Sequence, residues 1–238
     1  VPNIVGLLPP EARSVISKIC RERRAPVVSL SSKDFRITRE RTKFDYLRPG
    51  LKLRNFALSL KGRHQIKNCA LALKAVEVLR NRGFAMSRRA VEQGLRMTVW
   101  PGRFQVMPNG TGGPTLILDV CHNEAGVAAF ADTFVREFPR KRCLVLMGMV
   151  RRKQHQAMIN HLARIADEFR LVPLSTKRSV DIKALMAELD WRGVPVARSA
   201  KLATGYSALS KKASPDHIIA VIGSHYLVGE FLARFTGR

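Results

Sequence analysis

The chain has 238 residues and a formal net charge of +24, from 42 Lys and Arg against 18 Asp and Glu. Apolar residues make up 46% and charged residues 25% of the sequence, a balance that excludes a disordered or low-complexity chain. No apolar run approaches the ~20 residues of a membrane-spanning helix, so we expect no membrane segment. The positive charge favours polyanionic partners such as nucleic acid, nucleotide phosphates or an acidic substrate.

The first hundred residues predict helices mixed with short strands. Pro10 predicts a helix start, because proline is favoured in the first turn, and apolar residues follow at helical spacing. Ser87 is the expected N-cap of a later helix. The remaining patterns predict strands at 26–30 and within 51–60, and helices at 65–79 and 87–97.

From residue 100 onward, apolar strands and helices alternate. Trp100-Pro101-Gly102 interrupts regular structure, so we place a domain boundary there, with domains at 1–99 and 100–238. The alternation predicts an α/β fold with a mostly parallel sheet covered on both faces. Predicted strands are 115–118, 143–147, 171–174, 195–197 and 218–222, and predicted helices are 124–137, 154–168, 181–189, 201–210 and 226–235.

Two common nucleotide-binding motifs are missing from the sequence. There is no Gly-Lys dipeptide and hence no Walker A motif, and there is no G-x-G-x-x-G. The glycine-rich residues 109–114 predict a turn between strands rather than a phosphate loop, because no helix follows them. Four cysteines without C-x-x-C spacing predict reduced thiols rather than a zinc site or disulfides.

Polar residues follow three of the predicted strands. Ligands of open parallel sheets bind beyond the carboxyl ends of the strands, where this sequence places Asp119, His122, Lys153 and Ser224. A carboxylate can bind ribose hydroxyls, and cations can bind phosphate or carboxylate groups. Structural roles remain open for each residue: Asp119 and Ser224 as helix caps, His122 in a turn and Lys153 on the surface.

Four motifs occur in order along the chain: Gly-Arg-His-Gln-Ile-Lys-Asn at 62–68, Trp-Pro-Gly-Arg at 100–103, Leu-Asp-Val-Cys-His-Asn at 118–123 and Gly-Ser-His-Tyr-Leu at 223–227. Together they resemble the motifs of folylpolyglutamate synthase/dihydrofolate synthase, a branch of the Mur ligase superfamily. The resemblance covers nearly the whole chain and is strongest over residues 49–232.

The resemblance implies a fold and an activity. Residues 1–99 would be the incomplete C-terminal part of a central ATPase domain, and residues 100–238 a Rossmann-like glutamate-ligase domain. The family joins L-glutamate to the carboxylate of dihydropteroate or a folate, using ATP and Mg²⁺ and an acyl phosphate. Its P-loop and magnesium ligands precede the motifs present here, so we expect this chain alone to be inactive. We also expect a cytoplasmic monomer that begins partway through a longer protein.

The resemblance also implies roles for individual residues. Asn68 would contact adenine, Arg103 the ATP phosphates and Asp119 the ribose. His122 would lie near the phosphates or the acyl phosphate. The residues expected toward the incoming glutamate are Lys153, Ser224 and Tyr226, with His122 and Lys153 as the expected catalytic residues.

The sequence departs from the family pattern at two places. Glu124 stands where the family usually has Pro, and Arg152 and Gln154 flank Lys153 where the family has two acids. Because of these departures, a degenerate pseudoenzyme stays open as a reading of the sequence. So do a different Mur-type amide ligase and a non-catalytic, basic nucleic-acid-binding module. Only 7% of the residues are aromatic, which disfavours the nucleic-acid module because such modules stack bases on aromatic side chains.

Overall fold

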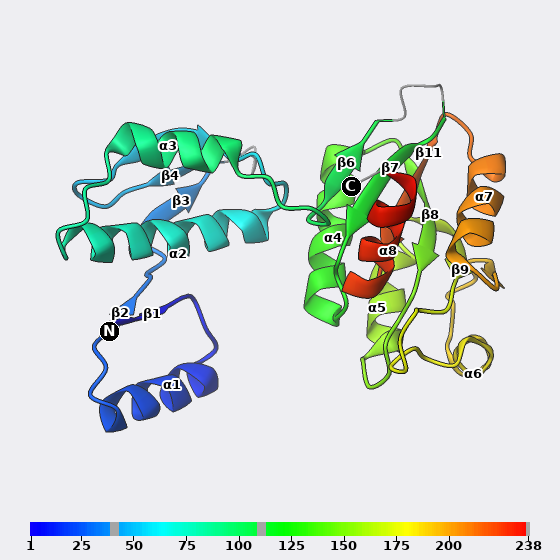
Figure 1. The fold of residues 1–238 in the computed structure, drawn as a ribbon, viewed down its shortest axis with the longest axis horizontal. Coiled ribbons are helices and arrows are strands. Elements are labelled where there is room, and N and C mark those ends of the chain that lie inside the picture. Colours follow the sequence, from blue (N-terminus) through cyan, green and yellow to red (C-terminus); the bar gives the residue numbers. More distant parts are fainter. Residues whose placement is uncertain (39–42, 109–112, 237–238) are drawn as a thin grey trace. The chain divides into compact units, whose positions relative to one another are not determined.

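The computed structural model of the protein describes residues 1–38, 43–108 and 113–236. The chain divides into two compact units, Val1–Val99 and Trp100–Arg238 (Figure 1). Most of the turn predicted at 109–114 lies outside the described residues. No helix in the described ranges is long and apolar enough to cross a membrane.

The first unit contains two small sheets. A parallel pair joins β1 (Asn3–Val5) to β2 (Val27–Ser29), with α1 (Pro10–Glu22) between them in the chain. The second sheet is an antiparallel meander of β3 (Phe35–Ile37), β4 (Lys43–Tyr46) and β5 (Leu53–Ala57). Two helices follow, α2 (Arg63–Arg80) and α3 (Arg88–Met97). Apolar residues of the meander and of α2 form one buried cluster, which holds this helix on the sheet.

Polar contacts also fix the first unit. The Lys74 ammonium group is buried and lies 3.3 Å from both Asp34 and Glu77, while the Tyr46 hydroxyl donates to Glu77 at 2.9 Å. These contacts tie α2 to β4 and to the loop before β3. As expected, Ser87 caps α3, because its hydroxyl oxygen accepts from the Ala90 N–H at 3.1 Å.

The second unit is built on a six-stranded sheet with the order β10-β9-β8-β11-β7-β6. The strands are β6 (Gln105–Met107), β7 (Thr115–Asp119), β8 (Arg142–Met147), β9 (Ala166–Leu171), β10 (Val196–Arg198) and β11 (His217–Ile222). The helices are α4 (Glu124–Glu137), α5 (His155–Leu162), α6 (Ile182–Glu188), α7 (Leu202–Lys212) and α8 (His225–Phe235). Every strand pair is parallel except β6 with β7, which confirms the predicted α/β fold with a mostly parallel sheet.

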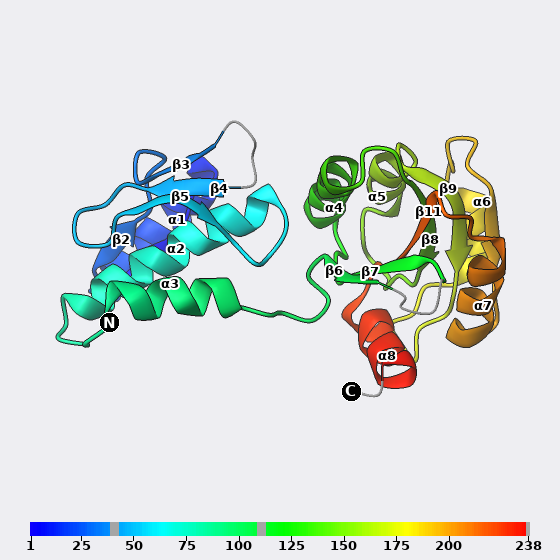
Figure 2. The ribbon, with the colours of Figure 1, turned by 90° about the horizontal axis from the view of Figure 1, so that it is seen from above.

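Helices cover both faces of this sheet (Figure 2). Alternate residues of β8 show why its sequence is apolar throughout: Cys143 and Val145 pack in the cluster with α4, α5 and α6, whereas Leu144 and Leu146 pack in the cluster with α7 and α8. Successive side chains of a strand point to opposite faces, so a strand covered on both sides requires apolar residues at every position.

One helix and one strand were predicted wrongly. The helix expected at 154–168 ends at Leu162, and the strand expected at 171–174 is β9, which begins at Ala166. The prediction failed because Asp167 and Glu168 are charged residues inside a strand, where their carboxylates are bound by cations.

Other short strands were missed, and one was placed too long. β1, β3 and β4 have only three or four residues each, too few to show a clear alternation. The strand pattern expected up to residue 60 ends at Ala57, and the Ser59 hydroxyl instead donates to the Thr98 carbonyl at 2.6 Å.

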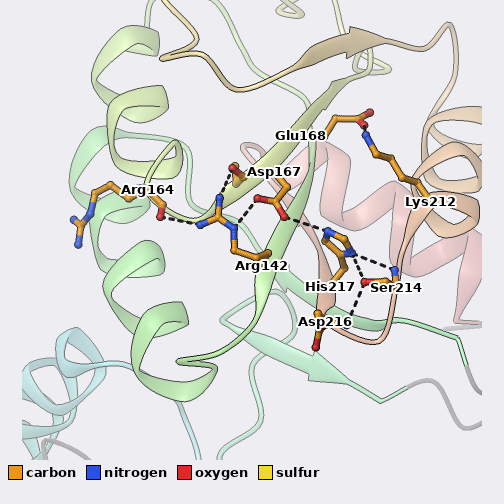
Figure 3. A network of polar contacts seen from close by, with 9 residues as sticks. Arg142, Arg164, Asp167, Glu168, Lys212, Ser214, Asp216 and His217 are labelled. Atoms are coloured by element: carbon orange, nitrogen blue, oxygen red, sulfur yellow. Dashed lines mark hydrogen bonds and ion pairs between the residues drawn. The ribbon is translucent and has the colours of Figure 1, made fainter.

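A polar network joins β8, β9 and β11 where these strands begin (Figure 3). Arg142 Nε donates to Asp167 Oδ1 at 2.6 Å, and His217 Nε2 lies 3.2 Å from Asp167 Oδ2. The Ser214 N–H donates to His217 Nδ1 at 3.1 Å, so the ring proton of a neutral His217 sits on Nε2 and faces Asp167. Glu168 lies 2.5 Å from Lys212 and 2.6 Å from Arg170. Each of these two acids therefore has two basic partners.

Candidate functional site

The candidate site lies at the opposite, carboxyl-terminal edge of the same sheet. Strands β8, β11 and β7 are neighbours and run parallel, so the segments that follow them start side by side. The segments after β8 and β11 approach closely: a Cβ on Gly223 would lie 2.7 Å from the Gly148 carbonyl oxygen. Gly223 also has φ of +105°, a conformation that L side chains rarely adopt, so this position requires glycine.

These segments surround a cavity of about 130 Å³. Its lining residues are His122, Val150, Lys153, Arg178, Ser224, His225 and Tyr226. Four of them are residues predicted from the sequence, and they come from the segments after three different strands. The volume suits a small metabolite and is well below the 300–1,000 Å³ of pockets for drug-sized ligands.

His122 has one ring nitrogen fixed by the backbone. Its Nδ1 donates to the Val120 carbonyl at 3.0 Å, because a carbonyl can only accept. In a neutral ring the other nitrogen, Nε2, therefore carries no proton and can accept a hydrogen bond. The centre of the His122 ring lies 5.2 Å from that of His225, so two imidazoles meet at the cavity.

Two helices begin at this edge. Ser224 is almost fully buried and caps α8 by accepting from the Tyr226 N–H at 3.1 Å. Asn123 caps α4 by accepting from the Gly126 N–H at 2.8 Å. Helix N-termini carry a partial positive charge and favour anions. Because its hydroxyl caps α8, Ser224 has a structural role, and it also lines the cavity.

Two paired loops place the cations. Val150 and Ser179 form an isolated antiparallel bridge, and the Arg151 N–H donates to the Arg178 carbonyl at 2.9 Å. His155 Nε2 donates to the Val150 carbonyl at 2.9 Å and braces the first loop. These contacts hold Lys153 and Arg178 at the cavity, where no described lining residue is an acid.

Asp119 lies beside the cavity rather than in its wall. The carboxylate is buried and accepts from the Phe104 N–H at 2.9 Å and the Cys121 N–H at 2.8 Å. Burial raises the pKa of Asp119, against the opposing effect of these hydrogen bonds and of the Arg103 charge. Arg103 is exposed, and its charge also lowers the pKa of His225, so it belongs to this edge.

Asn68 lies in the first unit, on an exposed position of α2, and its amide donates to Gln65 Oε1 at 3.1 Å. It is not among the residues that line the cavity.

Sequence reasoning gave no role to three cavity residues. His225 belongs to the Gly-Ser-His-Tyr-Leu motif at 223–227 and directly follows Ser224, so its position in the motif could have indicated that it lies at the site. Arg178 follows the strand predicted at 171–174, but the sequence pattern did not show the bridge between Val150 and Ser179 that brings it to the cavity. Val150 contributes the apolar part of the wall.

The described residues contain no group of three or more His, Cys, Asp or Glu side chains that could hold a metal ion. The residues around the cavity are positively charged or neutral, a donor set that fits anions and not Mg²⁺, which prefers carboxylate and carbonyl oxygens.

Solved structures with the same fold belong to folate enzymes. Mycobacterium tuberculosis folylpolyglutamate synthase, complexed with ADP and AMPPCP, matches 99% of this chain and 55% of its own, with a TM-score of 0.82 and 24% identity. Escherichia coli FolC in complex with DHPP and ADP matches 100% of this chain and 53% of its own, with a TM-score of 0.80 and 23% identity. At these identities the likeness shows the fold alone.

Sequence comparison identifies the family. The Bacillus subtilis dihydrofolate synthase/folylpolyglutamate synthase is 26% identical over 244 aligned residues, which cover 98% of this chain and 54% of that protein. The chain therefore spans about half the length of the curated relative. Residues 102–225, more than half of the chain, match the glutamate ligase domain of Mur ligases. These matches confirm the resemblance seen in the motifs, and the chain belongs to the Mur ligase family.

Proposed function

We propose that this chain is part of an ATP-dependent ligase that joins L-glutamate to the carboxylate of dihydropteroate or a folate through an acyl phosphate. The observation that carries the proposal is the cavity of about 130 Å³, in which Lys153 and Arg178 face two imidazoles and a helix N-terminus. The names of the relatives and the family match over 102–225 support the same reaction.

The cavity suits the amino acid in size and charge. Glutamate carries two carboxylates, and Lys153 and Arg178 each supply a positive charge without an ion-pair partner among the described residues. An Arg fork can bind a carboxylate through two parallel hydrogen bonds. Ser224 and Tyr226 add hydroxyl groups for orientation. The pterin and the nucleotide are larger than this cavity and would bind outside it.

ATP would supply the phosphoryl group that activates the carboxylate. In this proposal Arg103 donates hydrogen bonds to phosphate oxygens, His122 lies near the phosphates or the acyl phosphate, and Asn68 contacts adenine. The burial of Asp119 and its two backbone hydrogen bonds favour a positioning role, holding the Arg103–Phe104 segment, over direct ribose contact. No step is assigned to Mg²⁺, since the described residues offer no cluster of ligands for it. Catalysis then consists of positioning and charge neutralisation.

A ligation assay on the full-length protein tests the proposal. We expect phosphate release that requires ATP, L-glutamate and dihydropteroate or a folate together, with a product heavier by one glutamyl residue. Lys153→Met should abolish most of it, whereas Lys211→Met, on an exposed position of α7, should not. Absence of ligation with every pterin acceptor, combined with RNA binding that weakens steeply with salt, would instead favour the nucleic-acid-binding module.

A further inference from the structure

His225 occupies the first position of α8, directly after the capping residue Ser224. Its ring lines the cavity beside His122, Lys153 and Arg178. A molecule in the cavity would therefore touch this imidazole together with the two cations.

The ring nitrogens of His225 have no hydrogen-bond partner among the described residues of Trp100–Arg238. The contact that its ring makes is with the ring of His122. The other four histidines of this unit each have a polar partner: His122 with Val120, His155 with Val150, His161 with Glu124 and His217 with Asp167. His225 is exposed, so its ring nitrogens are open to solvent and to a ligand in the cavity.

The surroundings of His225 disfavour its protonated form. Partial desolvation, the neighbouring His122 and the charge of Arg103 lower the pKa of His225 below 6.5. Lys153, Arg178 and the N-terminus of α8 add positive charge from the other elements around the cavity. Acids of the adjoining helices are engaged elsewhere, Glu124 with His161 at 3.7 Å and Glu230 with Ser175 at 2.8 Å. His225 is thus a neutral base near pH 7.

An amino acid reaches such a site as an ammonium ion, which has no electron pair with which to attack. We propose that His225 accepts one ammonium proton from the incoming amino acid, an inference that rests on the proposed ligase function. One N–H bond breaks, its electron pair stays on nitrogen, and the proton moves to a ring nitrogen of His225. Nitrogen then forms the bond to the acyl carbon, the carbon–oxygen bond to phosphate breaks, and the departing phosphate takes the remaining surplus proton.

The test compares two nucleophiles in the full-length protein with the substitution His225→Gln. Hydroxylamine is uncharged at neutral pH and traps acyl phosphates without needing a base. We expect ligation of glutamate at pH 7 to fall about 100-fold, because a general base contributes 10²–10⁴-fold. Hydroxamate formation should stay within about twofold. Raising the pH should restore ligation by the variant, because more of the amine is then free.

The outcomes separate this inference from the proposed function. Wild-type ligation rates in the variant, or a parallel loss of hydroxamate formation, would overturn the role of His225 while leaving the ligase function standing. A wild-type protein that forms neither glutamate product nor hydroxamate would overturn both. His161→Gln is the matched control and should leave both rates unchanged, because His161 lies outside the cavity.

A second readout tests the base without catalysis. In an NMR titration of the ring protons, His225 should titrate at lower pH than the ordinary histidine value of 6.5, and His122→Gln should move its titration to higher pH, because the contribution of His122 to the lowered pKa of His225 is lost. A His225 that titrates at or above 6.5 in the wild-type protein would contradict the inference.

Discussion

Charged side chains are paired at the amino-terminal edge of the six-stranded sheet, which we call the paired edge. Among the described residues, they are unpaired at the carboxyl-terminal edge, the unpaired edge. At the amino-terminal edge, Asp167 lies 2.6 Å from Arg142 and 3.2 Å from His217 (Figure 3). At the carboxyl-terminal edge, Lys153 and Arg178 face a cavity whose described lining includes no acid. Both edges belong to the same strands, so the difference arises from side chains and not from the fold. Paired charges hold strands together, whereas unpaired cations of one sign are arranged for a ligand.

The largest effect on stability is expected where the segments after β8 and β11 lie close together. Gly223→Ala should lower the free energy of unfolding by about 3 kcal/mol, because the backbone has a positive φ and the new Cβ would meet the Gly148 carbonyl oxygen. Urea unfolding measures this. The matched control is Gly229→Ala in α8, where a Cβ meets nothing within 4 Å, and we expect it to stabilise slightly. Equal stability of the two variants would refute the tight packing of this edge.

The next largest loss of stability is expected when a carboxylate of the polar network is removed. Glu168→Gln leaves Lys212 and Arg170 without their carboxylate, and we expect a loss of about 2 kcal/mol, because Glu168 is buried while its partners are partly exposed. Thermal unfolding measures the loss. Glu188→Gln, at an exposed position of α6, should change stability by less than about 0.5 kcal/mol.

Glu168 also predicts a pH dependence. Burial alone would raise its pKa, but hydrogen bonds from Lys212 and Arg170 hold the pKa below the ordinary 4.5. A lowered pKa in the folded state means that the stabilisation is fully present above pH 4.5 and is lost as the pH falls through the lowered value. The stability difference between wild type and Glu168→Gln should therefore shrink in acid. A difference that stays constant down to about pH 2 would contradict this sign.

A smaller effect is expected at the unpaired edge. Arg178→Gln should raise the KM for glutamate about 10-fold in the ligation assay, which corresponds to the loss of one charge-assisted hydrogen bond, and should leave stability unchanged. Lys177→Gln changes an adjacent cation that does not line the cavity and should leave KM unaltered. If both variants raised KM equally, the effect would be one of general surface charge.

The smallest effect is expected for His217→Gln. The contact between His217 and Asp167 is partly exposed, with side-chain exposures of 20% and 34%, so its loss should cost less than about 1 kcal/mol. Thermal unfolding against wild type measures it, and a loss as large as that of Glu168→Gln would show that the whole network acts as one unit.

Much of the second unit followed from its sequence. The helix predicted at 124–137 has those bounds in the structure, and Ser224 precedes α8 as its cap. Long, strongly periodic segments and capping residues carry local signals, so they can be identified without tertiary information. The residues after the strands could be grouped because a parallel sheet brings its carboxyl ends to one edge.

The parts that could not be predicted depend on contacts distant in the chain. Glu168 lies in a strand because Lys212 binds it from α7, and no local pattern reveals that partner. Arg178 reaches the cavity through a bridge between Val150 and Ser179. The buried carboxylate of Asp119 accepts from the Phe104 N–H, which lies fifteen residues earlier in the chain.

The most direct test of the central claim observes both edges in one sample. Amide NMR spectra of the protein, recorded while L-glutamate is added, should shift at residues around the cavity, including His122, Lys153 and Tyr226. Residues of the opposite edge, such as Arg142 and His217, should remain unchanged. Saturable shifts confined to the carboxyl-terminal edge would support an anion-binding site built for the amino acid. Shifts at the paired edge, or none at the cavity, would contradict it.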